Sequence, residues 1–248
     1  MSPNGAQRNL LLILRARKTF PVTAPEHRLL LPDLVAKDRI IAVLRAPDST
    51  YLIDVALALV KAGICCIEVT LTTGGAMQSI QALRSRLEKD TCAVGAGSVL
   101  TVDDLEAAQS AGATYTLAPT LDLDVLSRAH QLGIAHVPGV ATPTEALTAW
   151  RAGAAAVKVF PASQLGGPSY VKALLGPLPD IKLIPTGGVG PDEVASYLNA
   201  GAVAVGVGGP LIGDALVNGP DDAFRNRLRH FVTGIRASSG ADRCHGGN

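Results

Sequence analysis

The chain has 248 residues, of which 48% are hydrophobic and 17% charged, with 22 basic and 21 acidic side chains. This balance argues against a protein that binds nucleic acid or a membrane surface, and the length fits a single α/β barrel domain. Two of the four cysteines, Cys65 and Cys66, are adjacent in an apolar run. They resemble reduced core residues rather than a disulfide framework, which favours a cytoplasmic protein.

The first 32 residues are interpreted as an N-terminal extension. Residues 10–14 form an apolar run followed by basic residues, but the run is too short to span a bilayer and no small-residue cleavage site follows it. We expect a terminal helix or a disordered segment there rather than a targeting signal. The domain is predicted over residues 33–237, and a tail over 238–248, rich in Ser and Gly, is predicted to be disordered.

An Ala-rich segment that ends at glycine and leads into an apolar stretch recurs along the chain. Each glycine suits the left-handed residue that ends a helix, and each apolar run suits a parallel strand buried on both faces. The spacing of the glycines corresponds to one or two strand–helix units, which predicts eight units in all. These glycines are Gly63, Gly112, Gly133, Gly153 and Gly201.

Strict alternation of strands and helices predicts a parallel sheet. Eight units favour closure into a (β/α)₈ barrel over an open doubly wound sheet, because no G-x-G-x-x-G motif follows the first strand. The predicted strands lie near residues 40–44, 64–69, 92–95, 114–117, 135–137, 155–159, 182–185 and 203–207.

Two helix starts carry capping signals. Thr101 and Thr142 each precede an acid by three positions, at Asp104 and Glu145, which predicts a reciprocal capping box. Pro143 adds the residue favoured at the first helical position. Helices are therefore predicted to begin directly after both threonines.

Lys158 is the most informative candidate residue, because it interrupts an apolar stretch at the end of the sixth predicted strand. In such barrels the active site lies at the carboxyl ends of the strands. Burial of a charged ammonium is costly, which favours the neutral amine, and a neutral amine attacks ketones to form a Schiff base. The alternative is a lysine that extends outward or pairs structurally with a carboxylate.

Glu68 is an acid in similarly apolar surroundings at the end of the second predicted strand. Imine chemistry requires several proton transfers, and a buried carboxyl group suits them. The alternative is a structural partner for Lys158, and both interpretations are compatible.

Glycine-rich turns follow the last two predicted strands, at residues 186–189 and 206–209. Their backbone N–H groups are predicted to bind phosphate, although a glycine pair is also an ordinary tight turn. Ser98 offers a hydroxyl after the third strand, and Arg45 offers a cation suited to a carboxylate after the first. His136 has no second ligand at metal-binding spacing, so no metal is expected.

These motifs, taken in order, resemble the 2-keto-3-deoxy-6-phosphogluconate (KDPG) aldolase family, whose members also include 2-keto-4-hydroxyglutarate (KHG) aldolases. The resemblance extends over roughly residues 33–236. It is carried by the segments at residues 40–45, 67–70, 95–99, 138–140, 157–162 and 185–189.

The resemblance implies roles for individual residues. Lys158 would be the Schiff-base lysine and Glu68 the general acid/base. It also implies a homotrimer with no metal and no cofactor, acting on a small 2-keto acid. The residues expected at the substrate are Arg45, Thr70, Thr72, Gly97, Ser98, Pro119 and Phe160. Those expected at a phosphate are Thr186, Gly187, Gly188, Gly208 and Gly209.

The chain departs from the family pattern at three of these positions. Thr72 stands where many members carry Arg, so carboxylate binding is expected to fall to Arg45 with help from Ser98, itself in place of the commoner Thr. At Gly209 many members have Ser. These changes leave the imine chemistry intact but weaken any prediction of the sugar acid that is accepted.

The sequence therefore predicts a lyase, a class I aldolase that reversibly cleaves KDPG into pyruvate and glyceraldehyde 3-phosphate. The galactonate epimer and 4-hydroxy-2-oxoglutarate remain open as substrates. An alternative of another class is a phosphosugar-binding barrel without activity, against which the presence of both Lys158 and Glu68 argues.

Overall fold

The computed structural model describes residues 28–88 and 90–241, with side chains described as far as residue 235. The strands are β1 (Ile40–Leu44), β2 (Cys66–Thr70), β3 (Ala93–Gly97), β4 (Tyr115–Leu117), β5 (Ala135–Val137), β6 (Gly139–Val140), β7 (Val157–Val159), β8 (Leu183–Pro185) and β9 (Val205–Val207). The helices are α2 (Asp33–Asp38), α3 (Leu52–Ala62), α4 (Ala76–Arg86), α5 (Val102–Ser110), α6 (Leu123–Leu132), α7 (Pro143–Arg151), α8 (Gly167–Leu175), η1 (Pro191–Glu193), α9 (Val194–Asn199), α10 (Gly209–Ile212), α11 (Ala215–Asn218) and α12 (Asp222–Ala241).

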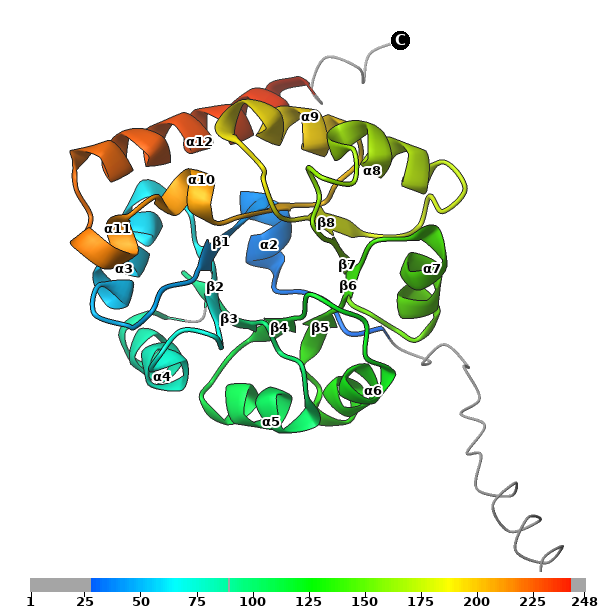
Figure 1. The fold of residues 1–248 in the computed structure, drawn as a ribbon, viewed down its shortest axis with the longest axis horizontal. Coiled ribbons are helices and arrows are strands. Elements are labelled where there is room, and N and C mark those ends of the chain that lie inside the picture. The colour runs from blue at the N-terminus through cyan, green and yellow to red at the C-terminus, as the bar shows by residue number, and fades with distance from the viewer. Residues whose placement is uncertain (1–27, 89, 242–248) are drawn as a thin grey trace, which may run out of the picture.

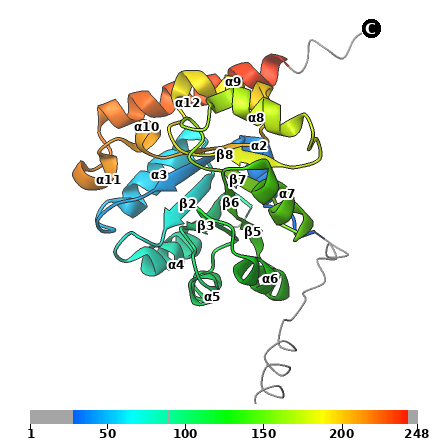
Figure 2. The ribbon, with the colours of Figure 1, turned by 45° about the vertical axis from the view of Figure 1, so that its right-hand side comes forward.

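All the strand pairs are parallel, and the strands form two sheets. The larger sheet has the order β5-β4-β3-β2-β1-β9 and the smaller one the order β6-β7-β8. The strands surround a common centre and the long helices lie outside them (Figures 1 and 2). The predicted α/β fold with parallel strands that curl around one centre is therefore confirmed, and the strands are divided between two sheets.

Both junctions between the sheets carry contacts. At one junction an isolated bridge pairs Thr186 with Gly206, and Val203 N donates to Leu183 O at 3.0 Å. At the other, β5 and β6 follow each other in the chain, separated only by Pro138. Because proline has no N–H to donate, it interrupts the ladder at this point. The strand predicted near residues 135–137 is observed as β5, and β6, which follows the proline, was not predicted.

The observed strands lie close to the predicted ones, with shifts at their ends. The strand predicted near residues 64–69 is observed as β2, which begins two residues later and ends one residue later, and β3 ends two residues beyond its prediction. Continuous apolar runs define a buried strand but do not define its ends. The shift matters because it places Thr70 and Gly97 inside strands.

The predicted helix termini are confirmed in detail. Thr101 and Thr142 form capping boxes with Asp104 and Glu145, as their spacing predicts. Gly63 caps the C-terminus of α3 with φ +92°, a conformation that only glycine adopts without strain. At the C-terminus α12 continues to Ala241, four residues past the predicted domain boundary; residues 242–248 lie outside the described part.

The strands separate two apolar regions. The outer face of each strand packs against the helices, while a second cluster fills the centre between the strands near their amino ends. Leu29, Leu31 and Leu34 of the N-terminal segment pack against this inner cluster, and α2 lies in the middle of Figure 1. The segment thus closes one end of the fold.

Arg28 anchors this segment to the outer helix α7. Its guanidinium donates to the carbonyl oxygens of Trp150 and Ala154 and lies 3.6 Å from the centre of the Trp150 ring. A cation at a helix C-terminus interacts favourably with the free carbonyls there. No periodic pattern in the sequence predicts this contact, and Arg28 falls within the predicted extension.

Candidate active site

Lys158 and Glu68 meet inside the fold, although 90 positions separate them in the chain. The Lys158 Nζ lies 3.5 Å from Oε1 of Glu68, and the two residues are 5% and 1% exposed. The second carboxyl oxygen, Oε2, has no hydrogen-bond partner among the described residues. A buried acid beside a buried amine, with one oxygen unused, can exchange protons with a bound molecule.

Two glycines on β3 leave space for buried side chains, Gly97 for Glu68 and Gly95 for Tyr115. A Cβ at Gly97 would lie 1.9 Å from Oε1 of Glu68, so any side chain there would displace the carboxyl group. A Cβ at Gly95 would lie 2.6 Å from the ring of Tyr115. Tyr115 is fully buried and donates to the carbonyl of Ile67 at 3.0 Å. The ring thereby supports the strand that carries Glu68.

A cavity of about 230 Å³ opens beside Lys158 at the carboxyl ends of the strands. The loops after β8 and β9 form much of its wall. Gly187 and Gly188 have φ values of +99° and +78°, a backbone conformation that glycine adopts at no cost. The cavity is lined by Val43, Arg45, Lys158, Phe160, Thr186, Gly187, Gly188, Gly208, Gly209, Pro210, Ile212 and Gly213.

Among the described residues, Arg45 is the one arginine that lines this cavity. Its Nη2 donates to Oγ of Ser98 at 3.3 Å. Ser98 has φ +61°, a left-handed conformation that costs a residue other than glycine about 1 kcal/mol or more. The hydroxyl is therefore held beside Arg45 by a backbone that glycine would adopt more easily.

Threonine hydroxyls form a network after β2. Oγ1 of Thr70 lies 3.2 Å from the Leu44 carbonyl and 3.2 Å from the hydroxyls of Thr72 and Thr73. Because Thr70 has one proton, which goes to the Leu44 carbonyl, the other two hydroxyls donate to it. Thr73 also accepts from Ala46 N at 3.2 Å. The network connects the loops after β1 and β2.

The structure brings most of the predicted residues together, but not all of them at the cavity wall. Those that line the cavity are Arg45, Lys158, Phe160, Thr186, Gly187, Gly188, Gly208 and Gly209. Thr70, Thr72, Gly97, Ser98 and Pro119 do not line it; Gly97 instead packs against Glu68, and Pro119 against Gly139.

Sequence reasoning missed some of the cavity wall. Val43, Pro210, Ile212 and Gly213 were not predicted. Val43 carried a usable signal, because it lies two positions before Arg45 and alternate strand residues share a face. The others lie in α10 and its end, where no motif marked them.

His136 is buried on the outer side of the strands, away from the cavity. Its Nδ1 lies 2.9 Å from Oγ1 of Thr116, and Nε2 has no partner among the described residues. Burial lowers the pKa of His136 to about 4. A neutral, packed imidazole fits the core role expected from the sequence.

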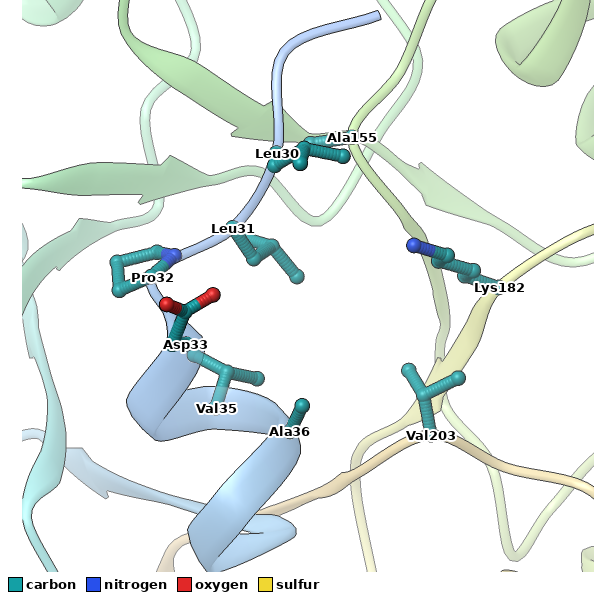
Figure 3. A pocket seen from close by; sticks show the side chains of 9 residues that line it. All are labelled: Leu30, Leu31, Pro32, Asp33, Val35, Ala36, Ala155, Lys182 and Val203. Atoms are coloured by element: carbon teal, nitrogen blue, oxygen red, sulfur yellow. The ribbon is translucent and has the colours of Figure 1, made fainter.

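A second cavity, of about 280 Å³, lies at the opposite, amino ends of the strands (Figure 3). Its walls come from the N-terminal segment and from Ala155, Lys182 and Val203. It is larger than the cavity at Lys158, but it holds no buried polar side chain, and its one lysine is exposed. Chemistry that requires a dry amine therefore favours the smaller cavity.

Within the described residues, no cluster of three or more His, Cys, Asp or Glu side chains is placed to hold a metal ion. None of the described helices is both long and apolar enough to cross a bilayer.

Comparisons with known proteins agree with this geometry. The family model described as "KDPG and KHG aldolase" matches residues 32–225. A 2-dehydro-3-deoxy-phosphogluconate aldolase of Pseudoalteromonas atlantica is 33% identical over 203 residues, which are 82% of this chain and 94% of the relative. A 2-dehydro-3-deoxy-6-phosphogalactonate aldolase of Escherichia coli is 36% identical over 173 residues, 69% of this chain and 83% of the relative.

A solved structure gives the same picture at lower identity. The KDPG aldolase of Legionella pneumophila, with pyruvate captured as a covalent carbinolamine intermediate, superposes with a TM-score of 0.64 at 25% identity. The match covers 83% of this chain and 96% of that one. Motif order, fold and the match over most of the sequence lead to one conclusion: the chain belongs to the KDPG and KHG aldolase family.

Proposed function

We propose that this protein is a class I aldolase, a lyase that uses Lys158 to form a Schiff base with 2-keto acids. One observation carries the proposal. A lysine amine that is 5% exposed lies 3.5 Å from a carboxyl oxygen at the wall of a cavity at the carboxyl ends of the strands. Such an amine is a nucleophile toward a ketone, and the acid beside it moves the protons.

The reaction proceeds through an imine. The neutral Nζ of Lys158 attacks C2 of the substrate, and the resulting carbinolamine loses water to give an iminium ion. A base removes the proton of the C4 hydroxyl, the C3–C4 bond breaks, and its electron pair passes to the iminium nitrogen as an enamine forms. The aldehyde leaves, C3 takes a proton, and water releases pyruvate and the free amine.

Glu68 is proposed to move these protons. It is close enough to Lys158 to protonate the departing carbinolamine hydroxyl, directly or through one water. Its unpartnered Oε2 offers the acceptor for the C4 hydroxyl proton. Gly97 has no side chain, so the Glu68 carboxyl group can occupy the space beside it. Gly97 is therefore proposed to position Glu68 rather than to bind substrate.

The proposed substrate is KDPG, with its phosphate against the glycine loops after β8 and β9. Backbone N–H groups of glycine turns bind phosphate well at this end of such folds. Arg45 lines the same cavity, so we propose that it faces the phosphate, in contrast to the carboxylate role expected from the sequence. The galactonate epimer is a second candidate, because an aldolase for it is 36% identical over 173 residues.

Four further expectations stay proposals. The two sheets are proposed to act as one closed (β/α)₈ barrel, supported by the Thr186–Gly206 bridge and the continuity of β5 with β6. A homotrimer is proposed from the resemblance, and the exposed Leu100 and Leu123 offer apolar surface for it. Light scattering tests the trimer. We also propose a cytoplasmic location and a reaction without metal or cofactor.

The imine is tested by trapping it. Pyruvate and borohydride are added to the protein, and the intact mass and the modified peptide are measured. We expect one reduced adduct, located on Lys158, that is absent from Lys158→Met and present in the control Lys182→Met. A phosphosugar-binding barrel without activity would gain no adduct, and that result would overturn the proposed function.

Substrate choice is tested separately. Initial rates are compared for KDPG, its galactonate epimer and 4-hydroxy-2-oxoglutarate with the same enzyme sample. The proposal expects the highest kcat/KM for KDPG. A preference for the unphosphorylated hydroxyglutarate would show that the glycine loops do not bind a phosphate.

A further inference from the structure

A groove on the outer surface, between α3 and α12, concentrates positive charge, and it shares no lining residue with the cavity at Lys158. It has a volume of about 410 Å³. Three of its lining residues are cations, Lys61, Arg225 and Arg229, and none is an acid. The chain as a whole is almost neutral, with 22 basic and 21 acidic side chains. The groove is therefore a local departure from the composition of the chain.

The spacing of the two arginines relative to each other does not stabilise α12. Arg225 and Arg229 are four positions apart on α12, where like charges repel each other. Both lie in the first half of this 20-residue helix, and Arg225 is close to its N-terminus, where a positive side chain is unfavourable. The dipole of α12 adds to the positive potential of the groove instead of offsetting it.

The cations are largely available to a ligand. Arg225 pairs with Asp222 at 2.9 Å, but the two side chains are 55% and 95% exposed, so water competes for this contact. Arg229 donates to the amide oxygen of Asn226, which is neutral. Within the described part of the chain, neither Lys61 nor Arg229 forms an ion pair with a carboxylate.

The floor of the groove is apolar. Ala58 and Ala62 of α3 are small and leave the hollow open, and Leu228 and Val232 of α12 form the facing wall. A volume of about 410 Å³ is within the range of small-molecule sites, roughly 300–1,000 Å³. Arginine side chains hold phosphate oxygens with two parallel hydrogen bonds. An apolar floor with a phosphate-binding rim fits a ligand that has both a flat ring and several phosphates.

We propose that the α3–α12 groove binds an organic polyphosphate, of which a nucleoside triphosphate is the fitting example. The phosphates contact Lys61, Arg225 and Arg229, and the base lies on the apolar floor. This site is separate from the proposed aldolase chemistry, because none of its residues lines the cavity at Lys158.

Calorimetric titration of the full-length protein with ATP tests the site, with inorganic tripolyphosphate and adenosine as further probes. We expect saturable binding of ATP, weaker binding of tripolyphosphate and none of adenosine. The Arg225→Gln/Arg229→Gln variant should bind ATP at least about tenfold more weakly, as expected for lost charged hydrogen bonds. The control Arg128→Gln removes an exposed arginine that pairs with Glu106 elsewhere on the surface, and should bind as the wild type does.

Arg45→Gln separates this groove from the cavity at Lys158 and should leave ATP binding unchanged. If Arg45→Gln abolished binding, ATP would occupy the Lys158 cavity and the proposal would be wrong. No saturable binding, or equal losses in Arg128→Gln and the double variant, would overturn it as well. Circular dichroism of each variant shows that the fold is retained.

Discussion

The two ends of the strands differ in what they are made of. At the carboxyl ends, glycines surround Lys158 and Glu68 and leave a cavity beside a buried polar pair. At the amino ends, leucines and Val35 fill the centre, and the larger cavity there has only exposed charges. The proposed chemistry therefore rests on a buried amine with an acid beside it, and not on which cavity is larger.

The strongest test of this comparison replaces one lysine at each end. Lys158→Met should lower kcat/KM for KDPG cleavage by about four to six orders of magnitude, as loss of a catalytic nucleophile does. Lys182→Met, at the cavity in Figure 3, should stay within about twofold of the wild type, as surface changes do. Steady-state kinetics of both variants gives the answer. Similar losses of kcat/KM in the two variants would contradict the proposal that only the carboxyl ends of the strands carry the reaction.

A glycine substitution tests whether the polar pair depends on its backbone surroundings. Gly97→Ala would place Cβ 1.9 Å from Oε1 of Glu68, so the carboxyl group must move. We expect kcat to fall about a hundredfold, the usual effect of displacing a reacting group by about 1 Å, with a much smaller change in KM. Gly176→Ala is the matched control, because its new Cβ would come no closer than 3.4 Å to its neighbours. An unchanged kcat in Gly97→Ala would contradict the positioning role.

Arg45→Gln sharpens the description of the carboxyl end. Loss of a charged hydrogen bond should raise KM for KDPG by about tenfold to a hundredfold. The unphosphorylated 2-keto-3-deoxygluconate should show little change if Arg45 faces the phosphate. Equal effects on both substrates would instead support the carboxylate role that the sequence predicts.

His136 lies between the two ends, on the outer side of β5, and makes stability depend on pH. Its folded pKa of about 4 lies below the ordinary value of 6.5, so the unfolded chain binds the proton more tightly. Its contribution is therefore present above pH 6.5 and is lost as the pH falls toward 4. We expect a loss of about 3 kcal/mol in the free energy of unfolding. Urea titrations at several pH values should show a shallower decline for His136→Gln.

The smallest expected effect concerns the amino end. Val35 is 2% exposed in the inner cluster, and Val35→Ala should lower the free energy of unfolding by about 2 kcal/mol. Because this end holds no catalytic group, kcat should not change. Thermal unfolding and initial rates are measured on the same sample. A fall in kcat without unfolding would show that the two ends are coupled.

Much of the carboxyl end was predictable because its residues interrupt apolar strands. Lys158 and Glu68 are charged residues in such runs, and parallel strands bring their ends to one edge. The cavity wall from α10 was not predictable, because Ile212 and Gly213 belong to a short helix without a pattern. The role of Arg28 was also missed, because its contacts with Trp150 and Ala154 join segments far apart in the sequence, and hydrophobic periodicity describes only local structure.

The strand ends show another limit of the sequence. A run such as residues 64–70 is buried on both faces, so hydrophobicity does not say where pairing begins. The strand predicted near residues 135–137 ended before Pro138, which cannot donate to a ladder, but the short strand that follows at residues 139–140 was not predicted. The register between strands and the closure of the sheet therefore depend on how the strands pair in the folded protein, and one strand's sequence does not determine them.

Ser98 has a consequence for engineering this enzyme. Its φ of +61° means that glycine would fit the backbone better, so a programme that selects for heat resistance would tend to replace it. The replacement would remove the hydroxyl that restrains the Arg45 guanidinium. Selection for thermostability would therefore remove a contact of Arg45, which is proposed to bind substrate, so variants chosen on melting temperature alone should be screened for turnover before they are kept.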